Sequence, residues 1–186
     1  MRPSSREAIL DAAFRLADHE RGAIAITFEA VAAEAGVTKA GVQYHFRSRR
    51  ELILAAMDYV ARRVERAMQQ YLAQPLDAAT PAERVGAYVD VVAAGRLTQG
   101  DLTVFAESLA DPAYLAPWSA VVEHWLDVRD IRDPALRLRV TVARLAADGL
   151  WLADATNISQ PDALIPGSDE RAAVVAHIRS LTKELA

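Results

Sequence analysis

Apolar residues recur at helical spacing along most of the chain, and no segment shows the strict alternation expected of a half-buried strand. Pro, Gly and N-cap residues divide this pattern into about nine stretches. The expected helices cover approximately residues 5–20, 28–35, 39–46, 48–74, 81–94, 101–110, 112–128, 135–155 and 169–185. We therefore expect an all-α fold, with an N-terminal three-helix head joined by a long helix to a helical body.

Two short helices separated by a tight turn are predicted between residues 27 and 46. Thr27 and Thr38 each stand where an N-cap side chain accepts a hydrogen bond from a free amide. Gly36 follows the first apolar stripe, at the position where a left-handed C-cap is easiest for glycine. Helix, turn and helix in this order are the layout of a helix-turn-helix DNA reader, whose second helix enters the major groove.

The second helix of this pair has a composition suited to nucleic acid. No carboxylate occurs between Ala35 and Arg50, a stretch that holds four cations. Cations and neutral hydrogen-bond donors together suit a phosphate surface. A solvated basic face on a helical bundle is the alternative interpretation of the charges alone. The residues expected to contact DNA are Thr27, Phe28, Thr38, Lys39, Ala40, Gly41, Gln43, Tyr44, His45 and Arg49.

The run VTKAGVQYHFRSRREL resembles the signature of the TetR family of transcriptional repressors. The positions that match are Val37, Thr38, Lys39, Ala40, Val42, His45, Phe46, Ser48, Arg49 and Leu52. Gly41 and Gln43 depart from it, since the family usually has Thr and Tyr there, and this puts the operator sequence in doubt. The resemblance covers residues 5–60 and implies a dimeric repressor that a small effector releases from its operator.

Composition and charge narrow the class of protein. The 186 residues include no cysteine, which excludes disulfides and thiol chemistry. No signal core and no apolar run of membrane-spanning length is present, so we expect a cytoplasmic protein without a membrane partner. The net charge is −4, but residues 1–50 hold eight Lys or Arg and six Asp or Glu, leaving this segment basic and the remainder acidic. Such a distribution suits a protein that contacts DNA at one end.

The last two long helices are predicted to form a homodimer interface. Apolar residues nearly encircle the helix 135–155, and a helix that is apolar all round is buried on two sides. A second copy of the chain is the simplest partner for the second apolar side, since helix-turn-helix proteins bind the paired half-sites of a pseudo-palindromic operator as dimers. The TetR resemblance implies the same four-helix contact, and closure of one chain's own core is the alternative. The expected interface residues are Leu138, Val142, Leu145, Leu150, Val174, Ile178 and Leu181.

Most of the large aromatic residues fall in the body, where the family's effector cavity would lie. The candidate pocket residues are Tyr88, Phe105, Trp118, His124, Trp125 and Trp151, and ordinary core packing is the alternative for each. Glu123, His124 and Asp127 give a weak hint of a metal site, but no two histidines have metal-ligand spacing, so no metal is expected. No phosphate loop or dinucleotide fingerprint is present, and no cofactor is expected.

The sequence therefore predicts a DNA-binding domain at residues 1–50 and an effector-binding and dimerisation domain at 51–186. The function expected is that of a dimeric transcriptional repressor that binds double-stranded DNA and leaves it when a small-molecule effector binds. An architectural DNA-binding protein without an effector is the first alternative. An all-α enzyme is the second, although no nucleophile sits in a recognisable catalytic turn.

Overall fold

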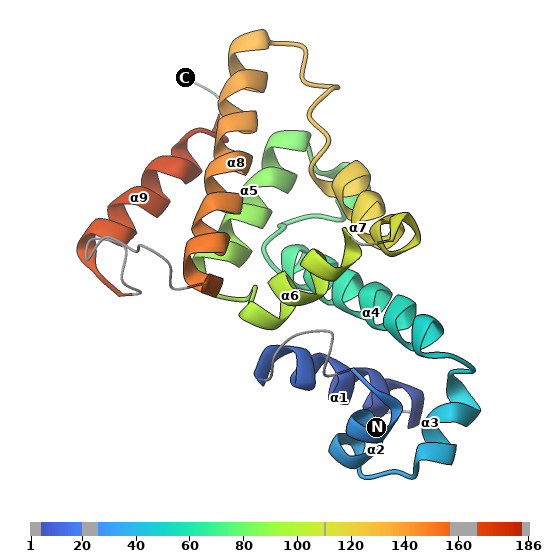
Figure 1. Cartoon of the computed structure of the whole chain (residues 1–186). Helices are drawn as coiled ribbons and strands as arrows, with labels where there is room; N and C mark the ends of the chain where they lie inside the picture. Colours follow the sequence, from blue (N-terminus) through green and yellow to red (C-terminus); the bar gives the residue numbers. More distant parts are fainter. Residues whose placement is uncertain (1–4, 20–25, 110, 157–166, 184–186) are drawn as a thin grey trace. The chain divides into compact units, whose positions relative to one another are not determined.

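The computed structural model describes residues 5–19, 26–109, 111–156 and 167–183, and within these ranges the chain forms nine α-helices and no strand (Figure 1). The predicted all-α fold is confirmed. One short 3-10 helix, η2 (Leu76–Ala78), lies between α4 and α5. The α-helices are α1 (Ser5–His19), α2 (Phe28–Ala35), α3 (Lys39–His45), α4 (Arg49–Gln69), α5 (Pro81–Ala93), α6 (Gln99–Ser108), α7 (Pro112–Trp125), α8 (Pro134–Thr156) and α9 (Asp169–Ser180).

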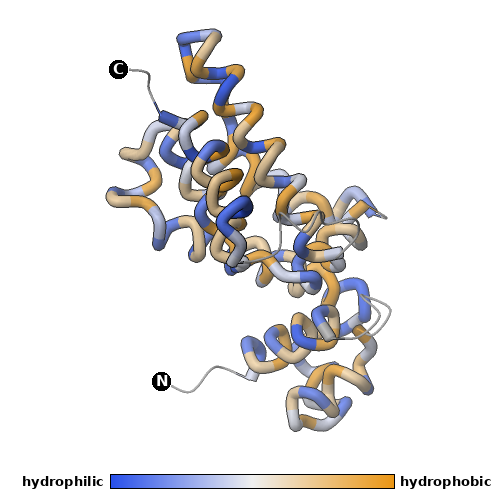
Figure 2. The backbone as a smooth tube through the Cα atoms, turned by 90° about the vertical axis from the view of Figure 1, so that its left-hand side faces the viewer, coloured by the Kyte–Doolittle hydropathy of each residue, from blue (hydrophilic) through white to orange (hydrophobic). Residues whose placement is uncertain are grey.

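The chain divides into two compact units that do not follow its order. One unit comprises Met1–Arg63 with Gln99–Ser119, and the other comprises Val64–Thr98 with Ala120–Ala186. The first therefore contains α6 and most of α7 in addition to the three N-terminal helices. Figure 2 shows hydrophobic and hydrophilic positions interspersed along the described helices, as expected of helices that bury one face and expose the other.

The first unit is built around α1, which packs against both α2 and α6. Ile9, Ala12 and Ala13 of α1 are at most 1% exposed. Val31 of α2 and Phe46, directly after α3, are fully buried. α2 packs on α1 and α3 packs on α2, and the opposite side of α3 is left free.

The second unit is built around α8, which packs against α5 and α9. Three interactions tie α8 to its neighbours within this unit. The Tyr88 hydroxyl donates to Asp148 Oδ1 at 2.7 Å, and the Trp151 indole donates to the Thr98 carbonyl at 3.3 Å. Arg171 forms a two-pronged ion pair with Asp154, in which neither side chain is more than 16% exposed. Burial and the neighbouring Asp148 carboxylate raise the pKa of Tyr88.

Most helix starts lie where the sequence predicts them, because their caps are local. The Thr80 hydroxyl and the Glu83 carboxylate form the reciprocal capping box at the start of α5. Ser168 accepts the Arg171 amide at the start of α9. At α4 the Ser48 hydroxyl accepts the Glu51 amide, but the Glu51 carboxylate bonds the amide of Arg47.

Several helix boundaries differ from the sequence-based expectation by two to five residues, among them the end of α4 and the start of α6. The helix predicted to reach residue 74 ends at Gln69, since the amides of Gln70 and Tyr71 bond carbonyls only three residues back and tighten the last turn. Asp101, the first residue of the helix expected at 101–110, instead lies fully buried inside α6 and pairs with Arg63. Asp18 of α1 occupies the capping position, because its Oδ1 accepts the Gly100 amide at 2.7 Å.

Candidate nucleic-acid interface

The helix pair α2 and α3 has the geometry that the sequence predicts. Thr27 Oγ1 accepts the Ala30 amide at 3.1 Å, and Thr38 Oγ1 accepts the Gly41 amide at 3.0 Å. Gly36 has φ +67°, in the left-handed region, and its amide bonds carbonyls in the last turn of α2. The turn between the helices is therefore short and fixed by hydrogen bonds at both ends.

One side of α3 is buried and the other is open. Val42 is fully buried, whereas Lys39, Ala40 and Gln43 are exposed, and Tyr44 is 86% exposed. Of the remaining predicted contacts, Thr38 and Arg49 are also exposed, and Thr27, Phe28, Gly41 and His45 are half-buried. An exposed tyrosine beside an amide and a cation gives α3 a surface able to donate hydrogen bonds and to pack against sugar or base.

The open side of α3 also tolerates a larger residue at Gly41. A Cβ at this position would come no closer than 3.4 Å to Thr38 Oγ1, an ordinary contact. The glycine is thus not required by packing within the chain.

Three cations near this surface already have partners within the chain. Lys39 Nζ lies 2.5 Å from Glu29 Oε1, and this hydrogen bond lowers the pKa of Glu29. The Arg49 Nε donates to the carbonyl of Ile26 at 2.9 Å, which ties the first turn of α4 to the segment before α2. The Arg50 guanidinium bonds Asp111. A phosphate must therefore compete with, or share, these partners.

The six predicted pocket residues fall in both compact units. Phe105 and Trp118 pack edge to face in the first unit, with ring centroids 5.5 Å apart. Tyr88, Trp125 and Trp151 are buried in the second. The buried indole nitrogens of Trp118 and Trp125 have no hydrogen-bond partner among the described residues.

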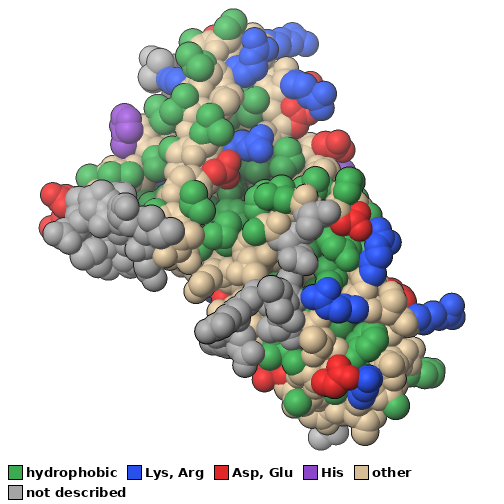
Figure 3. All heavy atoms as spheres, in the orientation of Figure 1, with side chains coloured by type: hydrophobic (Ala, Val, Ile, Leu, Met, Phe, Trp, Pro, Cys, Tyr) green, Lys and Arg blue, Asp and Glu red, His purple; other side chains and the backbone are tan. Residues whose placement is uncertain are grey.

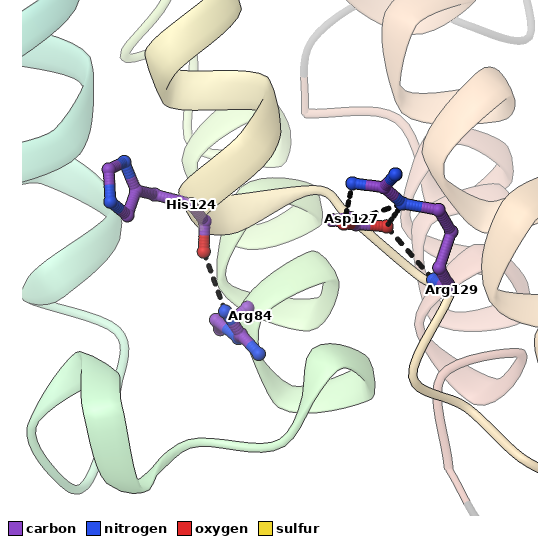
Figure 4. A network of polar contacts seen from close by, with 4 residues as sticks. All are labelled: Arg84, His124, Asp127 and Arg129. Atoms are coloured by element: carbon purple, nitrogen blue, oxygen red, sulfur yellow. Dashed lines mark hydrogen bonds and ion pairs between the residues drawn. The ribbon is translucent and has the colours of Figure 1, made fainter.

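His124 is exposed rather than part of a buried pocket. Its Nδ1 lies 3.1 Å from the Ala120 carbonyl, and its own carbonyl accepts a hydrogen bond from Arg84 at 2.6 Å (Figure 4). Asp127 beside it is bound by Arg129, which lowers the pKa of this carboxyl to about 2. No group of three metal-binding side chains occurs among the residues that the structure describes.

A surface hollow of about 220 Å³ lies next to this network, in the second unit. It is lined by Val122, Glu123, Leu126, Asp127, Val128, Arg129 and Arg144. None of the six predicted pocket residues lines it. Sequence reasoning missed it because its walls come from the end of α7, the segment that follows, and one arginine of α8.

The predicted dimer face divides into exposed and buried residues. Leu138, Val142 and Leu145 of α8 are 66%, 45% and 62% exposed, and hydrophobic side chains appear over α8 in the upper part of Figure 3. Val174 of α9 is 38% exposed and Leu181 is half-buried. Leu150 and Ile178, expected on the same face, are instead 6% exposed each and belong to the core of the chain. Leu152, which was not predicted, joins the exposed set at 52%.

No described helix has the length and hydropathy needed to cross a bilayer.

Residues 9–56 match the family described as bacterial regulatory proteins, tetR family. Residues 82–183, more than half of the chain, match the tetracyclin repressor-like C-terminal domain.

Curated relatives and solved structures agree with these matches. The HTH-type transcriptional regulator BetI of Brucella canis is 35% identical over 91 residues, 49% of this chain and 44% of that protein. Its counterpart in Rhizobium meliloti is 33% identical over 91 residues, so the match spans less than half of either relative.

Among solved structures, a transcriptional regulator of Streptomyces coelicolor A3(2) has a TM-score of 0.64 at 22% identity, covering 98% of this chain and 100% of that one. The multidrug binding protein EbrR complexed with imidazole has a TM-score of 0.63 at 23% identity, covering 100% and 98%. At these identities the structures establish the shared fold. Together with the two family matches, they show that this chain belongs to the TetR family of bacterial regulatory proteins.

Proposed function

We propose that this protein is a homodimeric transcriptional repressor that binds a pseudo-palindromic DNA operator through α3 and is released by a small-molecule effector. The observation that carries DNA binding is the open side of α3, where Lys39, Gln43 and Tyr44 stand exposed on a helix fixed by caps at both ends of the turn. Gln43 reads sequence, because a glutamine amide can bond adenine in the major groove with two hydrogen bonds. Arg49 binds phosphate.

The exposed stripe on α8 supports the homodimer. Leu138, Val142, Leu145 and Leu152 follow the spacing of a coiled-coil seam, with Gly149 between the last two. A Cβ at Gly149 would meet nothing within 4 Å, so the middle of the stripe is open. A second copy of the same stripe is the partner that fits, since two heads are needed to read two half-sites about 34 Å apart.

We propose the second compact unit as the place where the effector binds. The unpartnered indole nitrogen of Trp125 offers a hydrogen-bond donor. The hollow beside Arg144, which Trp125 does not line, offers charged side chains next to apolar ones. The related fold of EbrR has been solved with imidazole and with ethidium, which supports small-molecule binding in this architecture.

α4 is the element proposed to connect effector and operator. It is one continuous helix, and its residues up to Arg63 belong to the first unit while those from Val64 belong to the second. The coupling required is about 1–3 kcal/mol, and thermodynamic reciprocity demands that operator DNA weaken effector binding by the same factor. Calorimetry of one ligand with and without operator tests this, and equal affinities would contradict the coupling.

The DNA-binding proposal is tested by selecting bound duplexes from a random pool and then measuring variants on the enriched site and on random DNA. Gln43→Ala should reduce the preference for the enriched site by about 1–3 kcal/mol. Arg49→Ala should weaken binding to both duplexes by the same factor. It should also reduce the slope of log affinity against log salt concentration by about one unit.

Two controls accompany these variants. Arg62→Ala removes a charge from an exposed α4 residue that pairs with Asp58, and it should leave DNA binding unchanged. Thermal melting of Arg49→Ala is needed because Arg49 also bonds the Ile26 carbonyl. If both head variants bind the two duplexes like the parent, α3 and the start of α4 are not the DNA surface.

A further inference from the structure

Arg50, in the first turn of α4, is held by an acidic residue from a distant part of the chain. Its Nε and one terminal nitrogen donate to the same Asp111 oxygen, at 3.2 and 2.9 Å. Its guanidinium carbon lies 5.8 Å from the ring centroid of Tyr114 in α7. Arg50 adjoins Arg49 in sequence, and both follow α3 by only a few residues. All of these residues belong to the first compact unit.

Asp111 has a second role, at the start of α7. Its Oδ1 accepts the Ala113 amide at 2.9 Å, which is the hydrogen bond of an N-cap. The other oxygen, Oδ2, receives Arg50. The carboxylate is thus fixed to the first turn of α7 through one oxygen and holds Arg50 through the other. Hydrogen bonds from the Ala113 amide and from Arg50 lower the pKa of Asp111.

The pair is open to exchange. The Arg50 side chain is 56% exposed and that of Asp111 is 31% exposed, so water and ions reach both. Exposed ion pairs of this kind are weak. A phosphate diester offers a guanidinium the same paired oxygen acceptors as a carboxylate, within a much denser array of negative charge.

We propose that Arg50 is a second phosphate-binding residue of the DNA surface and that Asp111 withholds it until DNA displaces the carboxylate. This inference rests on the proposed DNA-binding function. Every DNA contact by Arg50 then requires the loss of its bond to Asp111. The exchange lowers affinity for all sequences equally, because phosphate contacts carry no base information.

The same geometry makes the availability of Arg50 depend on α7. Asp111 moves with the first turn of α7, since it caps that helix. α7 also carries Trp118, which packs on Phe105 of α6. A displacement of this turn changes the hold on Arg50, and therefore DNA affinity, without any change in α3.

The test measures binding of the full chain to a random-sequence duplex by fluorescence anisotropy over a range of salt concentrations. Asp111→Asn keeps an N-cap side chain and removes the charge. It should tighten DNA binding about two- to fivefold per head, which corresponds to the free energy of one exposed ion pair. Asp111→Ser, another good N-cap, should do the same and guards against a folding defect specific to asparagine.

The matched control is Asp133→Asn. Asp133 begins α8 with the same Asp-Pro-Ala sequence, and its Oδ1 accepts the Ala135 amide at 3.0 Å. The substitution removes the same charge from an equivalent cap, in the other compact unit. It should leave DNA affinity unchanged.

Arg50→Gln completes the cycle. It should weaken binding and reduce the salt slope by about one unit per head. The double variant Asp111→Asn with Arg50→Gln should bind like Arg50→Gln alone, because the charge of Asp111 affects DNA binding only through Arg50.

The inference is overturned if Asp111→Asn and Asp111→Ser bind like the parent or more weakly. Equal tightening by Asp111→Asn and Asp133→Asn would also overturn it, since it would then be an effect of net charge. A parent protein that binds no duplex at all overturns the proposed function and this inference with it. If the parent binds DNA but the Asp111 variants do not bind it more tightly, only this inference is overturned.

Discussion

The helix pairs α2–α3 and α8–α9 bury their apolar residues in different ways. In α2–α3, Val31 and Val42 are fully buried, and Tyr44 is the one large apolar side chain left exposed. In α8–α9, five such side chains are exposed: Leu138, Val142, Leu145, Leu152 and Val174. The first pair is complete within one chain and presents a polar surface. The second buries one face in its own unit and leaves the other uncovered, as expected of a surface that a second chain covers.

The largest effect is expected on the closed face of α8, at the ion pair between Asp154 and Arg171. The side chains are 16% and 7% exposed, and Asp154→Ala would leave the buried guanidinium without this carboxylate. We expect a loss of about 3 kcal/mol in the free energy of unfolding, measured by chemical denaturation at fixed protein concentration. Asp58→Ala, which breaks the exposed pair with Arg62, should cost less than about 0.5 kcal/mol. A similar small cost at both sites would contradict the difference between closed and open surfaces.

The open face of α8 is tested by Leu145→Asp, which places a charge in the proposed seam of both copies. We expect the dimer dissociation constant, measured by sedimentation, to rise about a hundredfold or more, while the helical content of the chain is retained. Leu150→Asp is the contrasting variant, because Leu150 is 6% exposed and its substitution should unfold the chain itself. A parent chain that sediments as a monomer at micromolar concentration would show that the open face has another purpose.

The smallest effects are expected from two glycines with open surroundings, one in each pair. Gly149→Ala adds a Cβ with no atom within 4 Å, and Gly41→Ala adds one in ordinary contact with Thr38 Oγ1 at 3.4 Å, so each should raise helix stability by about 0.5–1 kcal/mol in the isolated chain. Thermal melting measures that gain. Gly149→Ala should also alter dimer affinity, and Gly41→Ala should alter DNA affinity, each without affecting the other property. Loss of both properties in either variant would mean that the two surfaces are not separate.

Sequence alone predicts the parts of this fold that depend on neighbouring residues. The caps by Thr27 and Thr38 and the turn at Gly36 all involve atoms within a few positions. The predicted end of α4 lies five residues beyond the observed one, because the apolar spacing continues past Gln69 although the helix does not. Periodicity predicts where a helix can continue, and it does not show where tertiary packing stops it.

The features that sequence reasoning missed join distant residues. Asp18 and Gly100 are 82 residues apart, and Arg50 and Asp111 are 61 apart. For α8, apolar residues on nearly all sides gave no way to tell that Leu150 faces the core of its own chain while Leu145 does not. The residues proposed for the DNA surface come from the sequence alone, whereas the partners that hold its cations could not be predicted from it.

The contact between Gly100 and α1 limits how this protein can be recombined with its relatives. A Cβ at residue 100 would lie 2.7 Å from Asp18 Cβ and 2.8 Å from its Cα, so only glycine fits there unless the helices move apart. A chimera joined at residue 50, or anywhere before α6, would pair one parent's α1 with the other parent's α6. The segment that can be exchanged between relatives is therefore discontinuous. Residues 99–119 must come from the same parent as the N-terminal helices if the chimera is to fold.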